Sequence, residues 1–266
     1  MTDPADDGFR LTKWYVDCLD AGGRVAIAYW ASLTWRSLGF TWSSVAVYEP
    51  GTPVRRTSAL GRAAEPRLDG RSLTWRDPGI ETVVEAEVLQ AGASVRLFAS
   101  GAGSVEWTCA APVADVSVRA PGAAVVRGRG YAERLVLTLP PWRLPIRELR
   151  WGRWIAAESP RSLVWIDWRG AAPATWVLRD GALCPGATVT DTEVCAGGDR
   201  VSIGARLLLH SRRLDDVLGG LGPLRGLVPA AVLAIEDTRW ACDAPLRSSD
   251  GASVTGAAIA ELVRVP

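Results

Sequence analysis

Short runs of β-branched and aromatic residues, separated by Gly, Pro and Asp, recur along the whole chain. This rhythm is typical of antiparallel β proteins. In the segment 82–89, Val83, Glu85 and Glu87 fall on one face, and Thr82 shares the other face with three small apolar residues. Side chains alternate between the two faces of a strand, so this segment is predicted to be a strand with one wet face.

The same signals predict strands throughout the chain, over residues 24–30, 43–48, 72–75, 82–89, 94–98, 104–109, 115–119, 131–139, 149–155, 162–168, 175–179, 200–209 and 259–265. Helical spacing is found only in the segment 213–224, whose glycines limit it to a short helix. Long helices that alternate with strands are lacking, which argues against a doubly wound α/β fold.

The two halves of the chain open alike. Tyr15 and Asp17 stand two apart near the start, and Tyr131 and Glu133 stand two apart after a Gly/Ala-rich stretch. Residues two apart on a strand share a face. The expected fold is therefore all-β, with two related antiparallel β-barrels over residues 1–127 and 128–266 and at most one or two short helices. Small closed barrels can enclose one ligand.

Composition supports a packed globule. Of the 266 residues 48% are hydrophobic and 22% are charged, and the formal net charge is +1. This balance provides no field that would recruit nucleic acid. No run approaches the ~18 apolar residues of a membrane span. The acidic segment 1–8 lacks the features of a signal peptide, so a cytoplasmic location is expected.

Cysteine and histidine usage narrows the chemistry further. The five cysteines form no CxxC pair; Cys184 and Cys195 could meet across a hairpin, but small buried thiols are the favoured interpretation. Sites that need several histidines are excluded because His210 is the only one. We interpret His210 as a structural or surface residue. No nucleotide-binding motif is present, and no metal or cofactor is expected.

Thirteen tryptophans are more than a core of this size needs, and many of them cluster. A pocket lined by aromatic side chains is the usual form of a small-molecule site. The residues predicted to contact an apolar ligand are Tyr15, Trp30, Trp42, Tyr131, Trp151, Trp154 and Trp165. The alternative is that each tryptophan simply fills a core.

Three carboxylates are candidates for proton transfer: Asp167, Glu133 and Asp17. Asp167 lies in an apolar strand, where a charge is costly unless it is paired. It is either in a structural ion pair with Arg169 or Arg153, or it is an acid able to give a proton inside an apolar pocket. Glu133 and Asp17 carry the same ambiguity. The arginine run around Glu148 is interpreted as a structural charge network rather than as an anion site.

Four segments resemble the lipocalin-like carotenoid 1,2-hydratase superfamily, namely Lys13–Asp17, Gly128–Glu133, Trp151–Arg153 and Ala258–Arg264. The resemblance implies two tandem barrels with a ligand within or between them. Members include hydratases of isoprenoid double bonds and polyene cyclases, among them Diels–Alderases. Here Ala132 and Glu133 stand where that superfamily usually has His and Asp, and Ala260 replaces a common histidine, which argues against carotenoid hydration itself.

Three functions remain open from the sequence. An enzyme could protonate an isoprenoid or polyene to hydrate or cyclise it, with tryptophan faces stabilising the cation. A cyclase could act through shape alone, by a [4+2] reaction without acid or base. A carrier could bind a pigment or lipid without turnover. The enzyme is favoured, mainly by the resemblance. A homodimer could form through edge strands or the segment 221–234, although no motif indicates it.

Overall fold

The computed structural model describes residues 8–61, 63–204, 207–218 and 230–265. The chain divides into two compact units, Met1–Pro140 and Pro141–Pro266. Strand β10 (Val126–Leu137) spans the boundary expected near residue 127, and it belongs to the first unit because it pairs with β1 and β9. The second tyrosine–carboxylate segment thus lies in the same sheet as the first.

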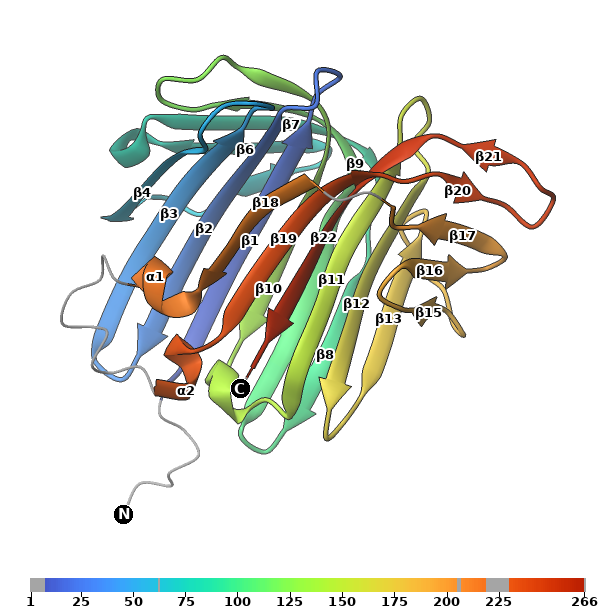
Figure 1. Ribbon diagram of the computed structural model, residues 1–266. Helices are drawn as coiled ribbons and strands as arrows, with labels where there is room; N and C mark the ends of the chain where they lie inside the picture. Colours follow the sequence, from blue (N-terminus) through green and yellow to red (C-terminus); the bar gives the residue numbers. More distant parts are fainter. Residues whose placement is uncertain (1–7, 62, 205–206, 219–229, 266) are drawn as a thin grey trace. The chain divides into compact units, whose positions relative to one another are not determined.

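The first unit is an antiparallel sheet of ten strands in the order β4-β3-β2-β1-β10-β9-β7-β6-β5, with β8 paired to β9 off this path (Figure 1). Its elements are β1 (Arg10–Leu19), β2 (Val25–Trp35), β3 (Leu38–Tyr48), β4 (Arg55–Gly61), β5 (Arg67–Asp69), β6 (Ser72–Asp77), the 3₁₀ turn η1 (Pro78–Ile80), β7 (Thr82–Gln90), β8 (Ser94–Ser100), β9 (Gly103–Arg119) and β10.

The second unit has a seven-stranded antiparallel sheet, β14-β13-β12-β11-β22-β19-β18, and a smaller one, β15-β16-β17-β20-β21. Its elements are η2 (Pro141–Arg143), β11 (Ile146–Ala156), β12 (Ser162–Gly170), β13 (Ala174–Arg179), β14 (Ala182–Leu183), β15 (Thr188–Val189), β16 (Glu193–Ala196), β17 (Asp199–Ser202), β18 (Leu207–Arg213), α1 (Leu214–Leu218), α2 (Ala230–Leu233), β19 (Glu236–Asp243), β20 (Leu246–Arg247), β21 (Ser253–Val254) and β22 (Gly256–Arg264).

The predicted fold class is confirmed: each unit is a curled antiparallel half-barrel, and the described α-helices are short. The alternation over 82–89 is also confirmed, since Glu85 and Glu87 are exposed while the Thr82 face is buried. The predicted helix over 213–224 begins as α1. Residues 219–229, which hold its end and most of the segment 221–234, lie outside the described residues. None of the described helices has the length and apolarity that a membrane crossing requires.

Two predicted strands are one in the structure. The segments 104–109 and 115–119 are joined in β9, although Pro112 lies between them. Proline has no N–H to donate, so it is tolerated in a sheet at bulges and edges. The pairing of β9 shifts register here against both β7 and β10, which explains why the strand continues. The predicted strand over 200–209, in contrast, is divided between β17 and β18.

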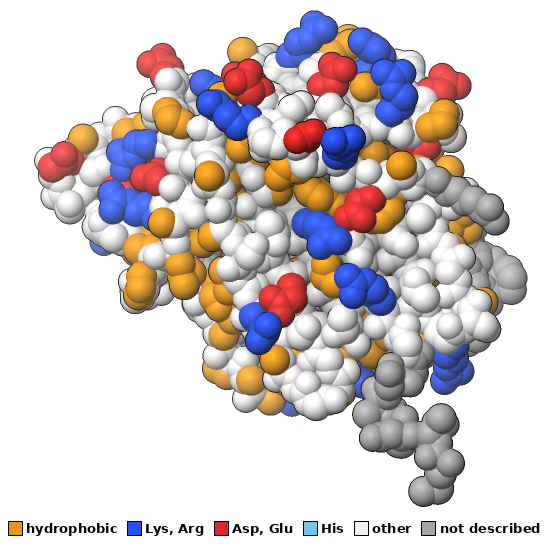
Figure 2. All heavy atoms as spheres, turned by 180° about the vertical axis from the view of Figure 1, so that it is seen from behind, with side chains coloured by type: hydrophobic (Ala, Val, Ile, Leu, Met, Phe, Trp, Pro, Cys, Tyr) orange, Lys and Arg blue, Asp and Glu red, His pale blue; other side chains and the backbone are white. Residues whose placement is uncertain are grey.

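Each unit has its own apolar core. In the first, Trp14, Trp30 and Trp75 are buried among valines and alanines of β1, β2 and the strands that follow. In the second, Trp154 and Trp165 are buried among Leu, Val and Ala side chains. Charged groups of both signs are interspersed on the surface, as Figure 2 shows for the face opposite to Figure 1. This agrees with the small net charge.

Candidate functional site

Two tyrosines and two carboxylates form a buried group on the neighbouring strands β1 and β10. In the antiparallel register Tyr15 faces Glu133, and Asp17 faces Tyr131. All four have exposed fractions between 0% and 8%. Residues that face each other across a strand pair have adjacent side chains, so the register brings the four together. We call this group the tyrosine–carboxylate cluster.

Hydrogen bonds order this cluster. The Tyr131 hydroxyl donates to Glu133 Oε2 at 2.8 Å, and the indole N–H of Trp107 donates to the same oxygen at 2.7 Å. The Tyr15 hydroxyl donates to Asp17 Oδ2 at 2.9 Å. Each pair thus repeats the same local arrangement, in which a tyrosine holds the carboxylate two residues further along its own strand.

Burial keeps the proton of the tyrosine in place. It raises the pKa of Tyr131 well above its ordinary value of 10.0, and the nearby Cys109 and Glu133 act in the same direction. Burial likewise raises the pKa of the Cys109 thiol well above 9.0. At neutral pH the cluster therefore holds a protonated phenol and a protonated thiol beside the Glu133 carboxyl group. Such buried titratable groups are costly and are often found at functional sites.

Aromatic rings continue from this cluster along the same face of the sheet. Tyr15 lies 6.1 Å from Tyr131 and 5.1 Å from Tyr29, between ring centroids, and Tyr29 lies 6.4 Å from Trp42. The Lys13 ammonium is 4.9 Å from the Tyr29 centroid. We call the run from Trp42 through Tyr29 and Tyr15 to Tyr131 the aromatic ladder. Trp42 and Lys13 are partly exposed, so the ladder leads from the surface towards the buried carboxyl groups.

The free energy of unfolding should fall as the pH rises past about 9. In the unfolded chain Cys109 loses its proton near its ordinary pKa of 9.0, whereas in the folded protein it keeps the proton. The folded-state pKa is raised, so stability is full below the unfolded value and is lost above it, by about 1.4 kcal/mol per pH unit. In urea titrations between about pH 7.5 and pH 10.5, the free energy of unfolding should fall more steeply with pH in the wild type than in Cys109→Ala. Parallel curves would contradict the burial of the thiol.

The remaining aromatic residues predicted in the first unit divide between the two faces of the sheet. Trp42 belongs to the ladder, whereas Trp30 lies in the core on the opposite face, where its N–H donates to the carbonyl of Ala63 at 2.9 Å. Trp30 thus packs in the core of the first unit, away from the ladder. Sequence reasoning missed Trp107 and Tyr29. Their strands could be predicted, but which strands become neighbours could not.

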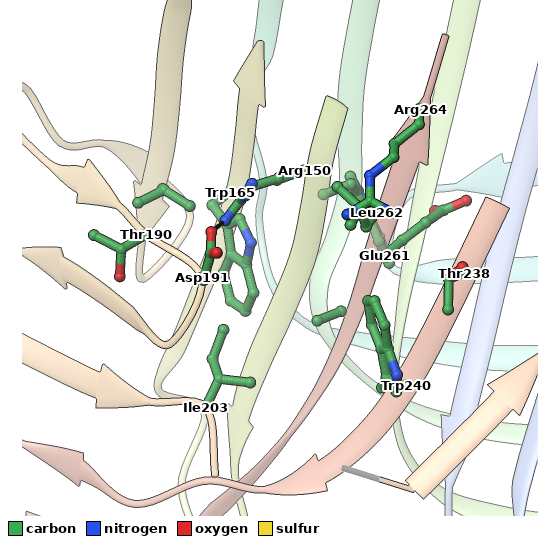
Figure 3. Close-up of a pocket in the computed structure, with 13 residues that line it drawn as sticks. Arg150, Trp165, Thr190, Asp191, Ile203, Thr238, Trp240, Glu261, Leu262 and Arg264 are labelled. Carbon is green, nitrogen blue, oxygen red and sulfur yellow. Dashed lines mark ion pairs between the residues drawn. The ribbon is translucent and has the colours of Figure 1, made fainter. Parts of the chain in front are cut away.

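The second unit contains a cavity of about 270 Å³, which we call the second-unit cavity. Two of the predicted tryptophans, Trp151 and Trp165, line it, and Trp240 and Ile203 complete its apolar walls (Figure 3). Trp154 lies in the core instead, where its N–H donates to the carbonyl of Ala244 at 2.6 Å. The cavity is thus aromatic on its inner side.

Arginines and carboxylates gather near the mouth of this cavity. Arg150 Nε donates to Glu148 at 2.8 Å, and the same guanidinium forms an ion pair with Asp191. Arg169 pairs with Asp167 at 2.9 Å, and the Thr175 hydroxyl donates to Asp167 at 2.7 Å. Of the two interpretations of Asp167, the structure shows the ion pair with Arg169. This carboxylate is held by two donors and does not line the cavity.

His210 is half of a structural pair on β18 and β19. Its Nε2 lies 3.0 Å from Asp237 Oδ2, and burial lowers the pKa of the imidazole below 6.5. Burial alone would raise the pKa of Asp237, but His210 and Arg239 hold it well below its ordinary value. In the described part of the chain no group of three or more His, Cys, Asp or Glu is placed to hold a metal ion. All five cysteines are free.

Comparisons with known proteins agree on the fold. No protein-family model matches the sequence, and no curated protein matches it. Solved structures match over nearly the whole chain, however. CghA bound to Sch210972 is 11% identical, with a TM-score of 0.53, over 97% of this chain and 89% of CghA. Kievitone hydratase from Nectria haematococca is 8% identical, with a TM-score of 0.55, over 99% of this chain and 93% of the hydratase.

A putative AttH from Nitrosomonas europaea is 12% identical, with a TM-score of 0.55, over 100% of this chain and 97% of its own. The likeness to these three structures concerns the fold, and it is the kind of fold that the motif resemblance implied. The expectation drawn from those motifs is therefore confirmed at the level of the fold. At such low identities the likeness carries neither a substrate nor a reaction from these proteins to this chain.

Proposed function

We propose that this chain is an enzyme that protonates a carbon–carbon double bond of an apolar isoprenoid or polyene and so hydrates or cyclises it. The observation that carries the proposal is the buried tyrosine–carboxylate cluster at the inner end of the aromatic ladder. Buried titratable groups gathered in one place are often found at functional sites. The resemblance of the sequence motifs to a superfamily of hydratases and cyclases supports the same class of reaction.

Different residues of the cluster donate the proton, position the donor and stabilise the cation. Glu133 gives the proton, so that its O–H bond breaks while a C–H bond forms at the alkene. Tyr131 and Trp107, which both hydrogen-bond to Glu133 Oε2, position the carboxyl group. The carbocation left on the substrate lies against the tyrosine rings, whose faces attract positive charge. Asp17, held by Tyr15, is the second carboxyl group able to exchange a proton at this site.

Either of two steps can consume the carbocation and restore the proton on Glu133. In hydration, water adds to the cation and then returns one proton to the Glu133 carboxylate, so the product gains one water. In cyclisation, a second double bond attacks the cation and a neighbouring C–H returns the proton, so the product is an isomer. Asp167 takes no part in this scheme, because Arg169 and Thr175 hold it.

Incubation with a panel of prenylated aromatics and linear polyenes, followed by mass spectrometry, tests this proposal. We expect at least one member to be converted to a product that is heavier by one water or is an isomer with a new retention time. Trp fluorescence quenching reports binding in the same samples. Tight binding with every compound recovered unchanged would contradict the proposal and indicate a carrier instead.

A further inference from the structure

The second-unit cavity has the features of a ligand site of its own, separate from the tyrosine–carboxylate cluster, which belongs to the first unit. Its volume of about 270 Å³ is slightly below the roughly 300 Å³ at which pockets for drug-sized ligands begin. It would hold about nine waters at about 30 Å³ each. The occupant that fits is therefore small, with one or two rings rather than a long chain.

The walls of the cavity favour a ligand with a flat, apolar ring. Trp165 and Trp240 stand on opposite sides of the cavity, and Ile203 lies below Trp165 (Figure 3). The Trp165 ring rests on Gly152, where even a Cβ would come within 2.2 Å of its Cζ2 atom. The ring is thus fixed in place, and because it is only 1% exposed it closes the cavity on this side rather than offering an open face. Aromatic rings prefer stacked or edge-to-face partners, so a ring bound here would pack against Trp240, which is partly exposed.

The mouth provides a charged donor. Arg150 has only 13% of its side chain exposed, and Glu148 holds it from one side. Its other contact is Asp191, whose side chain is 73% exposed on the loop between β15 and β16. Figure 3 shows this ion pair beside the Trp165 ring. A carboxylate so exposed contributes little stability. A ligand carboxylate placed over the apolar walls would be less exposed and so would bind the same guanidinium more strongly.

We infer that the second-unit cavity binds a small aromatic carboxylic acid, with its ring against Trp240 and its carboxylate on Arg150 in the place that Asp191 occupies. Asp191 is then an internal stand-in for the ligand's carboxylate and competes with it. This inference does not depend on the proposed function.

Calorimetric titration with 2-naphthoate, and with the neutral 2-naphthalenemethanol as its matched control, tests this assignment. Asp191→Asn should tighten naphthoate binding by up to about fivefold, because its competitor is weakened, and should leave the alcohol unchanged. Arg150→Gln should weaken naphthoate binding by about tenfold or more. Ala260→Leu, which fills the cavity, should abolish binding of both compounds.

The surface variant Asp250→Asn removes the same charge in the same unit, away from the cavity, and should leave the binding of both compounds unchanged. Arg150→Lys, which keeps the charge but not the forked donor, serves as the second variant if Arg150→Gln does not fold. The inference is overturned if naphthoate binds equally well to Ala260→Leu, if Asp191→Asn fails to tighten its binding, or if neither the wild type nor Asp191→Asn binds it.

Discussion

The Glu133→Gln variant is expected to lose turnover by about a hundredfold or more while keeping its fold. General acid catalysis typically contributes a factor of about 10²–10⁴, and an amide cannot give the proton. The amide oxygen can still accept from Tyr131 and Trp107, so most of the local hydrogen bonding survives. The measurement is the initial rate with the substrate found in the panel, together with a urea titration.

Glu106→Gln is the matched control, because Glu106 lies on β9 beside Trp107 but pairs on the surface with Arg96. It should keep wild-type turnover. The turnover of Tyr131→Phe should lie between those of Glu133→Gln and Glu106→Gln, since it removes a positioning hydrogen bond and leaves the carboxyl group. If Glu133→Gln turned over substrate at the wild-type rate, Glu133 would be a structural residue and the proposed chemistry would be wrong.

The Gly152→Ala variant is expected to be destabilised by about 3 kcal/mol, a large effect for one methyl group. The added Cβ would lie 2.2 Å from Trp165 Cζ2 and 2.8 Å from the backbone oxygen of Ile259. Trp165 is 1% exposed and belongs to the second core, so its ring cannot swing aside without opening that core. The midpoint and slope of urea unfolding measure the loss.

Gly204→Ala provides the control in the same unit, because among the described residues its Cβ would meet no atom closer than 3.8 Å. It should remain within about 0.5 kcal/mol of the wild type. A Gly152→Ala/Trp165→Phe double variant should recover part of the loss, since the two residues are in contact and their effects are coupled. Wild-type stability in Gly152→Ala alone would show that the ring does not rest on this glycine.

Much of the fold follows from local pattern. The alternation of Thr82 with Val83 and Glu85 predicted a strand with one solvent-exposed face, and the structure has such a strand here. The pairing of Tyr131 with Glu133 on one strand face was likewise visible, because it depends only on the two-residue period. Nothing local indicated that this strand lies beside the one carrying Tyr15 and Asp17. Register between segments so far apart is decided by the whole sheet.

The same limit applies to the second unit. The sequence left two roles open for Asp167, a proton-donating acid and a structural ion pair. Choosing between these roles required the positions of Arg169 and, on the neighbouring strand, of Thr175. Trp165 was predicted to meet a ligand from its type alone, whereas Trp240 and Ile203 carried no local signal. A cavity forms where several elements pack around a space without filling it. It therefore cannot be predicted from the sequence of any single segment.

The deuterium content of the product formed in D₂O tests the central claim, that a carboxyl group of the cluster protonates the substrate. We expect the wild-type product to carry one deuterium on carbon, because the proton that Glu133 gives exchanges with solvent before each turnover. Glu133→Gln should form almost no product. A wild-type product without carbon-bound deuterium would mean that no proton is delivered to carbon, and cyclisation by shape alone would replace acid catalysis as the account of this protein.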